Sequence, residues 1–242
     1  MPERFPILTP VGEDALLVEY EPEISLEVNR KVRLLAHSLE RETVAGISEI
    51  IPAYRSLMIY FHPQQAGLAE VRAAIEHRAK NSRNVELPPA RVFRVPVVYG
   101  GTYGPDLARV ATTTRMREQE VTRLFSTQRY PVYCLGFLCC LANLGGVPEK
   151  LRLPRLTTPR TWLPAGSVGF AGAQAVVLPI DQPSGFHYIG RTFVTMYDPS
   201  QSPPSPIRPG DIIECPSVSE AEAKRWAGRS LGDCLVEGIS HP

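Results

Sequence analysis

The sequence predicts an α+β protein, with a small α/β domain in residues 1–90 followed by a β-barrel domain in residues 91–242. The first ninety residues alternate strand-like apolar runs with runs whose apolar residues recur at helical spacing. Beyond them, Gly and Pro separate many short β-rich runs, a texture typical of a closed barrel. Proline supplies 24 of 242 residues, about twice its usual ~5% share, and is concentrated after Pro88.

The first domain shows the element order β-α-β-β-α-β. Two amphipathic helices are predicted, one after Pro22 to about Arg41 and one from Leu68 to about Arg83. The predicted strands cover residues 15–20, 47–51, 57–61 and 91–99. This order is the split βαβ pattern of a ferredoxin-like sandwich. That fold hosts many unrelated functions, so it predicts none here.

The second domain opens with the glycine-rich loop GGTYG and a short helix after Pro105, with Asp106 beside it. Glycines before a helix can bind an anion, although a plain loop-to-helix cap explains the same residues. The spacing matches neither a P-loop nor a dinucleotide fingerprint. Further elements are predicted as a helix over 116–124, strands over 130–134, 193–197 and 212–215, a Gly/Pro-punctuated β-ribbon over 155–192, and a helical tail over 219–227.

Charge and hydropathy exclude several classes of partner. The formal net charge is +1, so no overall field draws the chain to nucleic acid or to an anionic membrane. The N-terminus has no apolar signal region, and no run reaches the roughly 18 apolar residues of a membrane span. We therefore expect a soluble, cytoplasmic protein without a nucleic-acid or membrane partner.

The five cysteines do not have the spacing of a metal site. Cys134, Cys139 and Cys140 are too crowded for a CxxC pair, and no histidine cluster accompanies them. We expect reduced cysteines packed as small apolar side chains, and no bound metal. A thiolate role for Cys139 or Cys140 would require a cationic neighbour that lowers the pKa.

The ribbon carries the candidate binding residues. Arg160 and Arg191 present planar paired donors that match a carboxylate or a phosphate, although each guanidinium could equally form a structural salt bridge. Ser167 could donate to a bound carbonyl or simply close a turn. Gln174 could orient a substrate amide.

Two residues are catalytic candidates. His187 is a candidate general base, with a packed or exposed imidazole as the competing interpretation. Ser126 carries a hydroxyl, but without an adjacent base it would not be an activated nucleophile.

The motifs GGTYGPDLARVA, EVTRLFSTQRYPVYCLGF, PRLTTPRTWLPAGSVGFAG and SGFHYIGRT resemble one family, and the likeness covers most of residues 12–215. This is the family of the B subunit of the bacterial ATP-dependent 5-oxoprolinase, also called allophanate hydrolase subunit 1, which includes an inhibitor of a sporulation histidine kinase. The resemblance implies a small α/β domain followed by a cyclophilin-like β-barrel. It also implies a second barrel protein, the C subunit of such an enzyme, as the usual partner.

The chain departs from the family pattern near the expected pocket. Phe125 stands where the family has a histidine, and Cys139 and Cys140 stand where it has Pro-Gly. Leu141 and Phe186 replace a phenylalanine and a tryptophan. Phe125 and Phe186 are therefore expected to line a remodelled, more apolar pocket.

Three functions remain open at this point. The first is a 5-oxoprolinase subunit that acts on a small cyclic amide or carboxylate, with no cofactor bound by this chain alone and ATP in a complex. The second is a diverged stand-alone cyclase, isomerase or lyase with a hydrophobic substrate. The third is a non-catalytic module of the kinase-inhibitor type. The expected partner is a barrel protein like the C subunit or, in a homo-oligomer, a second copy of the chain.

Overall fold

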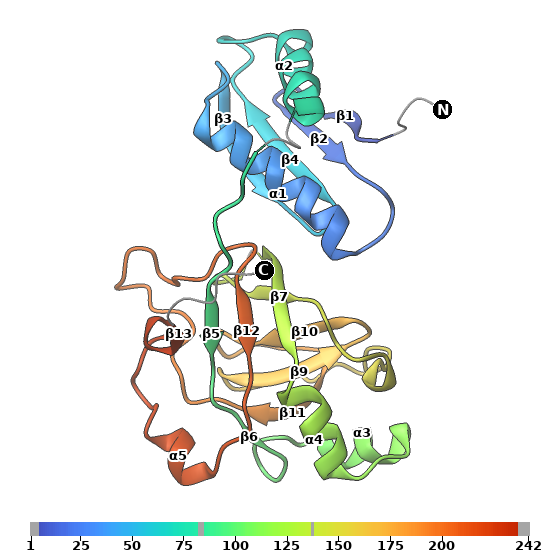
Figure 1. Ribbon diagram of the computed structural model, residues 1–242, viewed down its shortest axis with the longest axis vertical. Helices are drawn as coiled ribbons and strands as arrows, with labels where there is room; N and C mark the ends of the chain where they lie inside the picture. Colours follow the sequence, from blue (N-terminus) through green and yellow to red (C-terminus); the bar gives the residue numbers. More distant parts are fainter. Residues whose placement is uncertain (1–4, 82–84, 137, 237–242) are drawn as a thin grey trace. The chain divides into compact units, whose positions relative to one another are not determined.

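The protein is an α+β protein with a small sheet and a separate curled sheet. The computed structural model describes residues 5–81, 85–136 and 138–236 (Figure 1). The chain divides into two compact units, Met1–Pro89 and Ala90–Pro242. Each unit has its own hydrophobic core.

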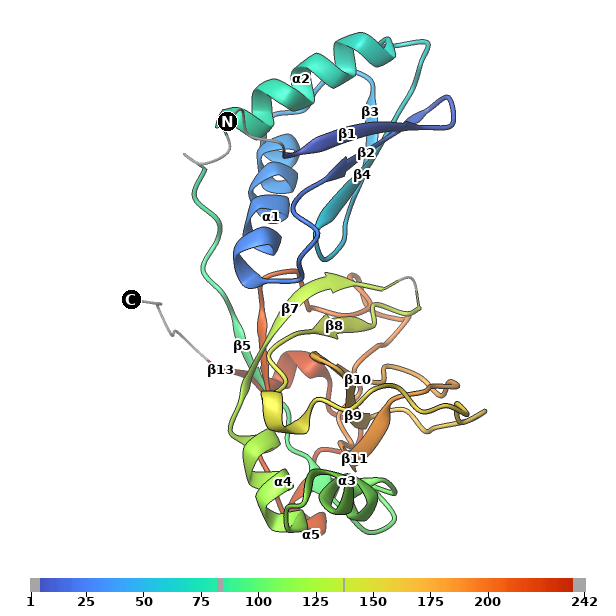
Figure 2. The same cartoon turned by 90° about the vertical axis from the view of Figure 1, so that its right-hand side faces the viewer.

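The first unit contains a four-stranded antiparallel sheet in the order β1-β2-β4-β3. The strands are β1 (Ile7–Val11), β2 (Ala15–Glu19), β3 (Ile47–Pro52) and β4 (Ser56–Phe61). The helices are α1 (Leu26–Arg41) and α2 (Leu68–Asn81), and Figure 2 shows α1 lying along the sheet. Residues 82–84, where the second helix was expected to end, lie outside the described residues.

Helix α1 confirms the periodicity argument. Ser25 caps it by accepting a hydrogen bond from the Val28 amide at 3.3 Å. Val28, Val32 and Leu35 recur on one face and are buried against the sheet. The helix ends at Arg41, the residue expected from the sequence.

The last strand of the predicted split βαβ pattern is not part of this sheet. Residues 91–99 instead form β5 (Val92–Arg94) and β6 (Val98–Tyr99) of the second unit, because Phe93, Val95 and Val97 are buried in that unit's core. Beside β2 the small sheet has β1, which the sequence did not predict. Pro10 is a residue that argues against a strand when only the sequence is considered. A proline is tolerated there because β1 is an edge strand.

The second unit contains a nine-stranded sheet in the order β13-β5-β12-β7-β8-β10-β9-β11-β6. Its remaining strands are β7 (Arg129–Leu135), β8 (Ala142–Leu144), β9 (Ser167–Ala171), β10 (Gln174–Val177), β11 (His187–Arg191), β12 (Ile212–Glu214) and β13 (Leu235–Val236). The helices are α3 (Leu107–Thr114), α4 (Glu118–Ser126) and α5 (Glu220–Lys224), with 3-10 turns η2 (Glu149–Leu151) and η3 (Leu231–Cys234).

This sheet is a curled half-barrel, so the prediction of a closed barrel is corrected. Within the described residues the strand order ends at β13 and β6, which do not pair with each other. The strand expected over 193–197 is also absent, because Thr195 forms only an isolated bridge with Ser230. Most of the ribbon before β9 contains no regular strand, although Arg160 and Leu163 exchange backbone hydrogen bonds with Ser184 and Gln182. No helix in the described part of the chain is long and apolar enough to cross a membrane.

Candidate functional site

Asp106 is a buried carboxylate that joins three segments of the second unit. It is 1% exposed and stands at the start of α3. Arg160 donates to it twice, from Nη1 to Oδ2 at 2.8 Å and from Nη2 to Oδ1 at 2.6 Å. Arg109 Nη2 donates to Oδ1 at 2.9 Å, and the Tyr188 amide donates to Oδ2 at 2.8 Å. Four donors thus fill the acceptor positions of one carboxylate.

These donors keep Asp106 ionised. Burial raises the pKa of a carboxyl group, but the hydrogen bonds from Arg160, Arg109 and the Tyr188 amide act in the opposite direction and lower the pKa of Asp106 below its usual value. The paired fork of Arg160 supplies the geometry in which a guanidinium binds a carboxylate most strongly. Asp106 is therefore a fixed negative charge between two arginines.

His187 belongs to the same network. Its Nε2 lies 2.7 Å from the Pro154 carbonyl oxygen, which can only accept, so Nε2 carries the hydrogen. Nδ1 then accepts from Arg109 Nη2 at 2.9 Å. The imidazole is buried, 4% exposed, and its ring lies beside Phe170. Both ring nitrogens are engaged, so His187 orients Arg109 within this network.

The network carries an excess of positive charge. The side chains of Arg109 and Arg160 are 48% and 31% exposed, and they share the single carboxylate of Asp106. Each guanidinium has five N–H donors and uses two of them in the contacts with Asp106 and His187. We call Arg109, Arg155 and Arg160 the arginine cluster.

Arg155 joins this cluster through its position over the ring of Phe186, at 4.7 Å from the centroid. Burial raises the pKa of Tyr188 to about 12, whereas the charges of Arg155 and Arg160 act to lower it. Both arginines therefore contribute positive charge around Tyr188. Tyr188 directs that hydroxyl to Ser184 Oγ at 2.8 Å. The cluster thus has the chemistry to bind a carboxylate or a phosphate.

Backbone pairing positions Arg160. Its amide donates to the Ser184 carbonyl at 2.9 Å, and the Ser184 amide donates back at 3.0 Å. On the other side, Gly104 lets the loop before α3 approach β11, because a Cβ at this position would lie 2.0 Å from the Ile189 carbonyl oxygen. Asp106 consequently reaches the Tyr188 amide from the helix side.

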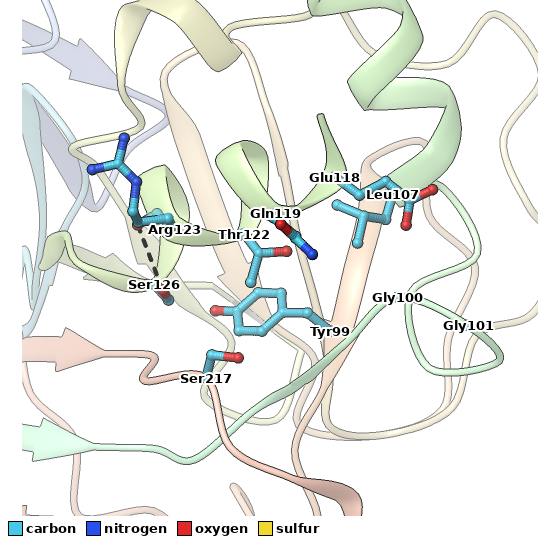
Figure 3. A pocket seen from close by; sticks show the side chains of 10 residues that line it. All are labelled: Tyr99, Gly100, Gly101, Leu107, Glu118, Gln119, Thr122, Arg123, Ser126 and Ser217. Carbon is cyan, nitrogen blue, oxygen red and sulfur yellow. Dashed lines mark hydrogen bonds between the residues drawn. The ribbon is translucent and has the colours of Figure 1, made fainter. Parts of the chain in front are cut away.

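Ser126 lies elsewhere, in a separate pocket of about 500 Å³ (Figure 3). Residues of α4, the loop after β6 and Ser217 line this pocket, and Figure 3 shows Gln119, Thr122 and Tyr99 grouped in it. Ser126 Oγ is 3.5 Å from the Arg123 carbonyl oxygen, to which it donates. His187 is not among the lining residues, so the structure does not bring the two catalytic candidates together.

Arg191 and Ser167 make local contacts. Arg191 Nε donates to the Ala165 carbonyl at 3.0 Å, and its guanidinium lies over the ring of Phe193. Ser167 Oγ donates to the Pro164 carbonyl at 2.6 Å, which closes a turn. Gln174 is the first residue of β10 and is half-buried. None of these three contacts Asp106 directly through a hydrogen bond in the described residues.

The structure separates the two expected pocket aromatics. Phe125 is fully buried in the main core, where its ring contacts Tyr130 at 4.8 Å and Phe170 at 5.8 Å between centroids. Phe186 belongs to a different apolar cluster, together with Leu141. Phe125 therefore fills core volume rather than lining the pocket beside Ser126.

Sequence reasoning missed the arginine cluster as a unit. Asp106 was visible only as a residue beside Pro105 at a helix start, and Arg109 and Arg155 carried no motif of their own. The distance of 54 positions between Asp106 and Arg160 leaves no local pattern. Among the described residues, no group of three or more His, Cys, Asp or Glu side chains could hold a metal ion.

The chain is similar in sequence to a known protein family and to a named bacterial protein. The family described as "Carboxyltransferase domain, subdomain C and D" matches residues 6–207. A Bacillus subtilis (strain 168) protein, named as the B subunit of 5-oxoprolinase, is 34% identical over 223 residues, covering 88% of this chain and 92% of the relative.

Two solved structures are similar as well. The crystal structure of TTHA0988 aligns with a TM-score of 0.74 and 29% identity, over 85% of this chain. This chain spans only 40% of the length of that protein. The K. lactis urea amidolyase aligns with a TM-score of 0.71 over 90% of this chain and 15% of its own, and at 19% identity it shows the fold alone.

Proposed function

The chain belongs to the carboxyltransferase domain family, subdomain C and D, and we propose that it acts as one component of an ATP-dependent amide hydrolase of the 5-oxoprolinase type. The name of the Bacillus subtilis relative supports this, because it describes one component of a 5-oxoprolinase and this chain covers nearly all of it. The proposal includes a cyclophilin-like character for the half-barrel of the second unit.

The arginine cluster is the observation that indicates the class of substrate. Arg109 and Arg160 keep unused N–H donors and one uncompensated positive charge beside the buried Asp106 carboxylate. A small carboxylate or a cyclic amide that carries one, such as 5-oxoproline, offers the charge and the planar oxygen pair that a guanidinium binds. Arg155, over the ring of Phe186, adds a third positive charge to this cluster.

In this proposal the residues have distinct roles. Arg160 and Arg109 bind the substrate carboxylate, Asp106 holds the two guanidiniums in place, and His187 positions Arg109 through Nδ1. This positioning role takes the place of the general-base role expected for His187 from the sequence. ATP and the remaining catalytic groups come from a partner, for which a barrel protein like the C subunit is the first candidate.

The test is ring opening of 5-oxoproline by the chain together with its partner proteins. The chain is co-expressed and purified with a second barrel protein and an ATP-binding protein, and glutamate and phosphate release are measured with and without ATP. We expect ATP-dependent glutamate formation, and a KM for 5-oxoproline raised at least ~10-fold by Arg160→Ala, as loss of a charge-assisted hydrogen bond pair predicts.

Arg117→Ala is the matched control, because the Arg117 side chain is 79% exposed and, among the described residues, forms its ion pair with Glu120 in the first turn of α4. This variant should keep the KM of the unchanged protein. A stable complex that opens no ring under any of these conditions contradicts the proposed reaction. Activity that is indifferent to Arg160→Ala contradicts the assignment of the arginine cluster.

A further inference from the structure

Cys139 and Cys140 are adjacent cysteines at the turn between β7 and β8. The Leu141 amide donates to the Leu138 carbonyl at 2.9 Å across them, and both have positive φ, 47° and 58°. These are the features of a type I′ turn, which normally requires Asn-Gly or a similar pair. Two cysteines thus occupy a turn for which their side chains are poorly suited.

The turn geometry brings the two side chains closer to one side of the chain than a strand would. Along a strand, consecutive side chains point to opposite faces, whereas helix-like dihedral angles of either hand rotate them by only about 100°. Cys139 and Cys140 are both half-buried and unbridged. Each therefore remains accessible while lying next to the other.

The other three cysteines have a different environment. Cys134, Cys215 and Cys234 are 4%, 1% and 3% exposed, and burial raises the pKa of these thiols to about 11, 12 and 12. Because these three thiols are buried and have raised pKa values, they are unreactive and pack as apolar side chains. Among the residues that the structure describes, only the pair in the turn offers accessible sulfur.

We propose that Cys139 and Cys140 form a two-thiolate binding site for a soft, thiophilic metal or metalloid ion. Thiolates are the protein ligands that such ions select, and two neighbouring thiols act as a chelate with a high effective concentration. Zinc does not fit, because it needs four ligands and no third His, Cys, Asp or Glu side chain in the described residues joins the pair.

A direct disulfide fits less well than a bridging ion. Consecutive Cα atoms lie about 3.80 Å apart across a trans peptide, below the roughly 4.4–6.8 Å that disulfides usually span, so the ring would be strained and readily reduced. An interposed ion lengthens the bridge between the sulfur atoms.

Phenylarsine oxide is the probe for this site. Its trivalent arsenic forms two As–S bonds, the As=O bond breaks, and the oxygen leaves as water with the two thiol protons, without oxidation or reduction. The full chain, reduced with a phosphine, is titrated and followed by intact mass spectrometry and free-thiol counting. We expect one adduct per chain, loss of two titratable thiols, release by an excess of a 1,2-dithiol, and resistance to a monothiol.

Cys139→Gly and Cys140→Gly test the assignment without disturbing the turn, because glycine favours positive φ. Each should abolish the adduct that resists monothiol. Cys134→Ala, in the neighbouring strand, should retain it, and retained folding of all variants is checked by circular dichroism. The proposal is overturned if no adduct forms at one equivalent, if a monothiol removes it, or if it persists in either glycine variant.

Discussion

Asp106→Asn is expected to destabilise the second unit by about 3 kcal/mol. Asparagine keeps one acceptor oxygen but places an NH₂ group against the donors of Arg160 and the Tyr188 amide. Two charge-assisted hydrogen bonds, worth roughly 1.5–3 kcal/mol each, are lost. Part of the loss is recovered because Arg109 and Arg160 are 48% and 31% exposed and regain water.

Urea unfolding followed by tryptophan fluorescence measures this change. The chain has two tryptophans, Trp162 and Trp226, and both belong to the second unit, so the signal reports its unfolding separately from the first unit. Asp181→Asn is the control in the same unit, because Asp181 is exposed and accepts one bond from the Ala165 amide. It should change the free energy of unfolding by about 0.5 kcal/mol or less.

The pH dependence provides a second check of the same argument. The folded pKa of Asp106 is lowered, so its ionised form stabilises the fold above the unfolded pKa of about 3.9. That stabilisation is lost as the pH falls through the lowered folded pKa. The difference in the free energy of unfolding between the unchanged protein and Asp106→Asn should be constant from about pH 7 to 5. It should become smaller below about pH 4. The reasoning would be refuted if, at pH 7, Asp106→Asn lowered the free energy of unfolding by less than about 1 kcal/mol and no more than the control Asp181→Asn does.

Three further substitutions test the packing around the site. Gly104→Ala should cost about 3 kcal/mol in urea unfolding, because its Cβ would meet the Ile189 carbonyl at 2.0 Å, and an unchanged midpoint would contradict the close approach. Tyr130→Phe should cost about 1 kcal/mol through loss of the buried 2.7 Å bond to the Phe125 carbonyl; thermal unfolding checks this. Cys140→Gly should raise the free energy of unfolding by about 0.5 kcal/mol, because glycine adopts the positive φ of this position without strain. Cys140→Ala keeps a Cβ at the same positive φ and should not raise it.

Elements with local signals were predicted well from the sequence. Helix α1 combines a serine cap with apolar residues at 3.6-residue spacing, and both features depend only on neighbouring residues. β4 (Ser56–Phe61) was predicted over 57–61 from its β-rich run, and the structure buries the alternate residues Leu57, Ile59 and Phe61. The motif PAGSVGFAG similarly indicated the family, which the match over residues 6–207 confirms.

Elements whose place depends on distant partners were not predicted. The run 91–99 has strand composition, but composition does not say which sheet it joins, and its burial against the second core decided that. Phe125 was expected in a pocket because a histidine was expected there by resemblance. The packing of three aromatic rings places it in the core instead.

The sequence by itself determined the local elements, the family and the presence of arginines suited to an anion. Only the tertiary structure decided which arginines act together. Arg160 and Tyr188 lie 54 and 82 positions from Asp106, so no periodicity links them to it. Arg160 and Tyr188 contact Asp106 because Gly104 allows the loop before α3 to approach β11 and because the Arg160 backbone pairs with Ser184. A buried carboxylate selects its partners by proximity in space, and only the folded chain supplies that proximity.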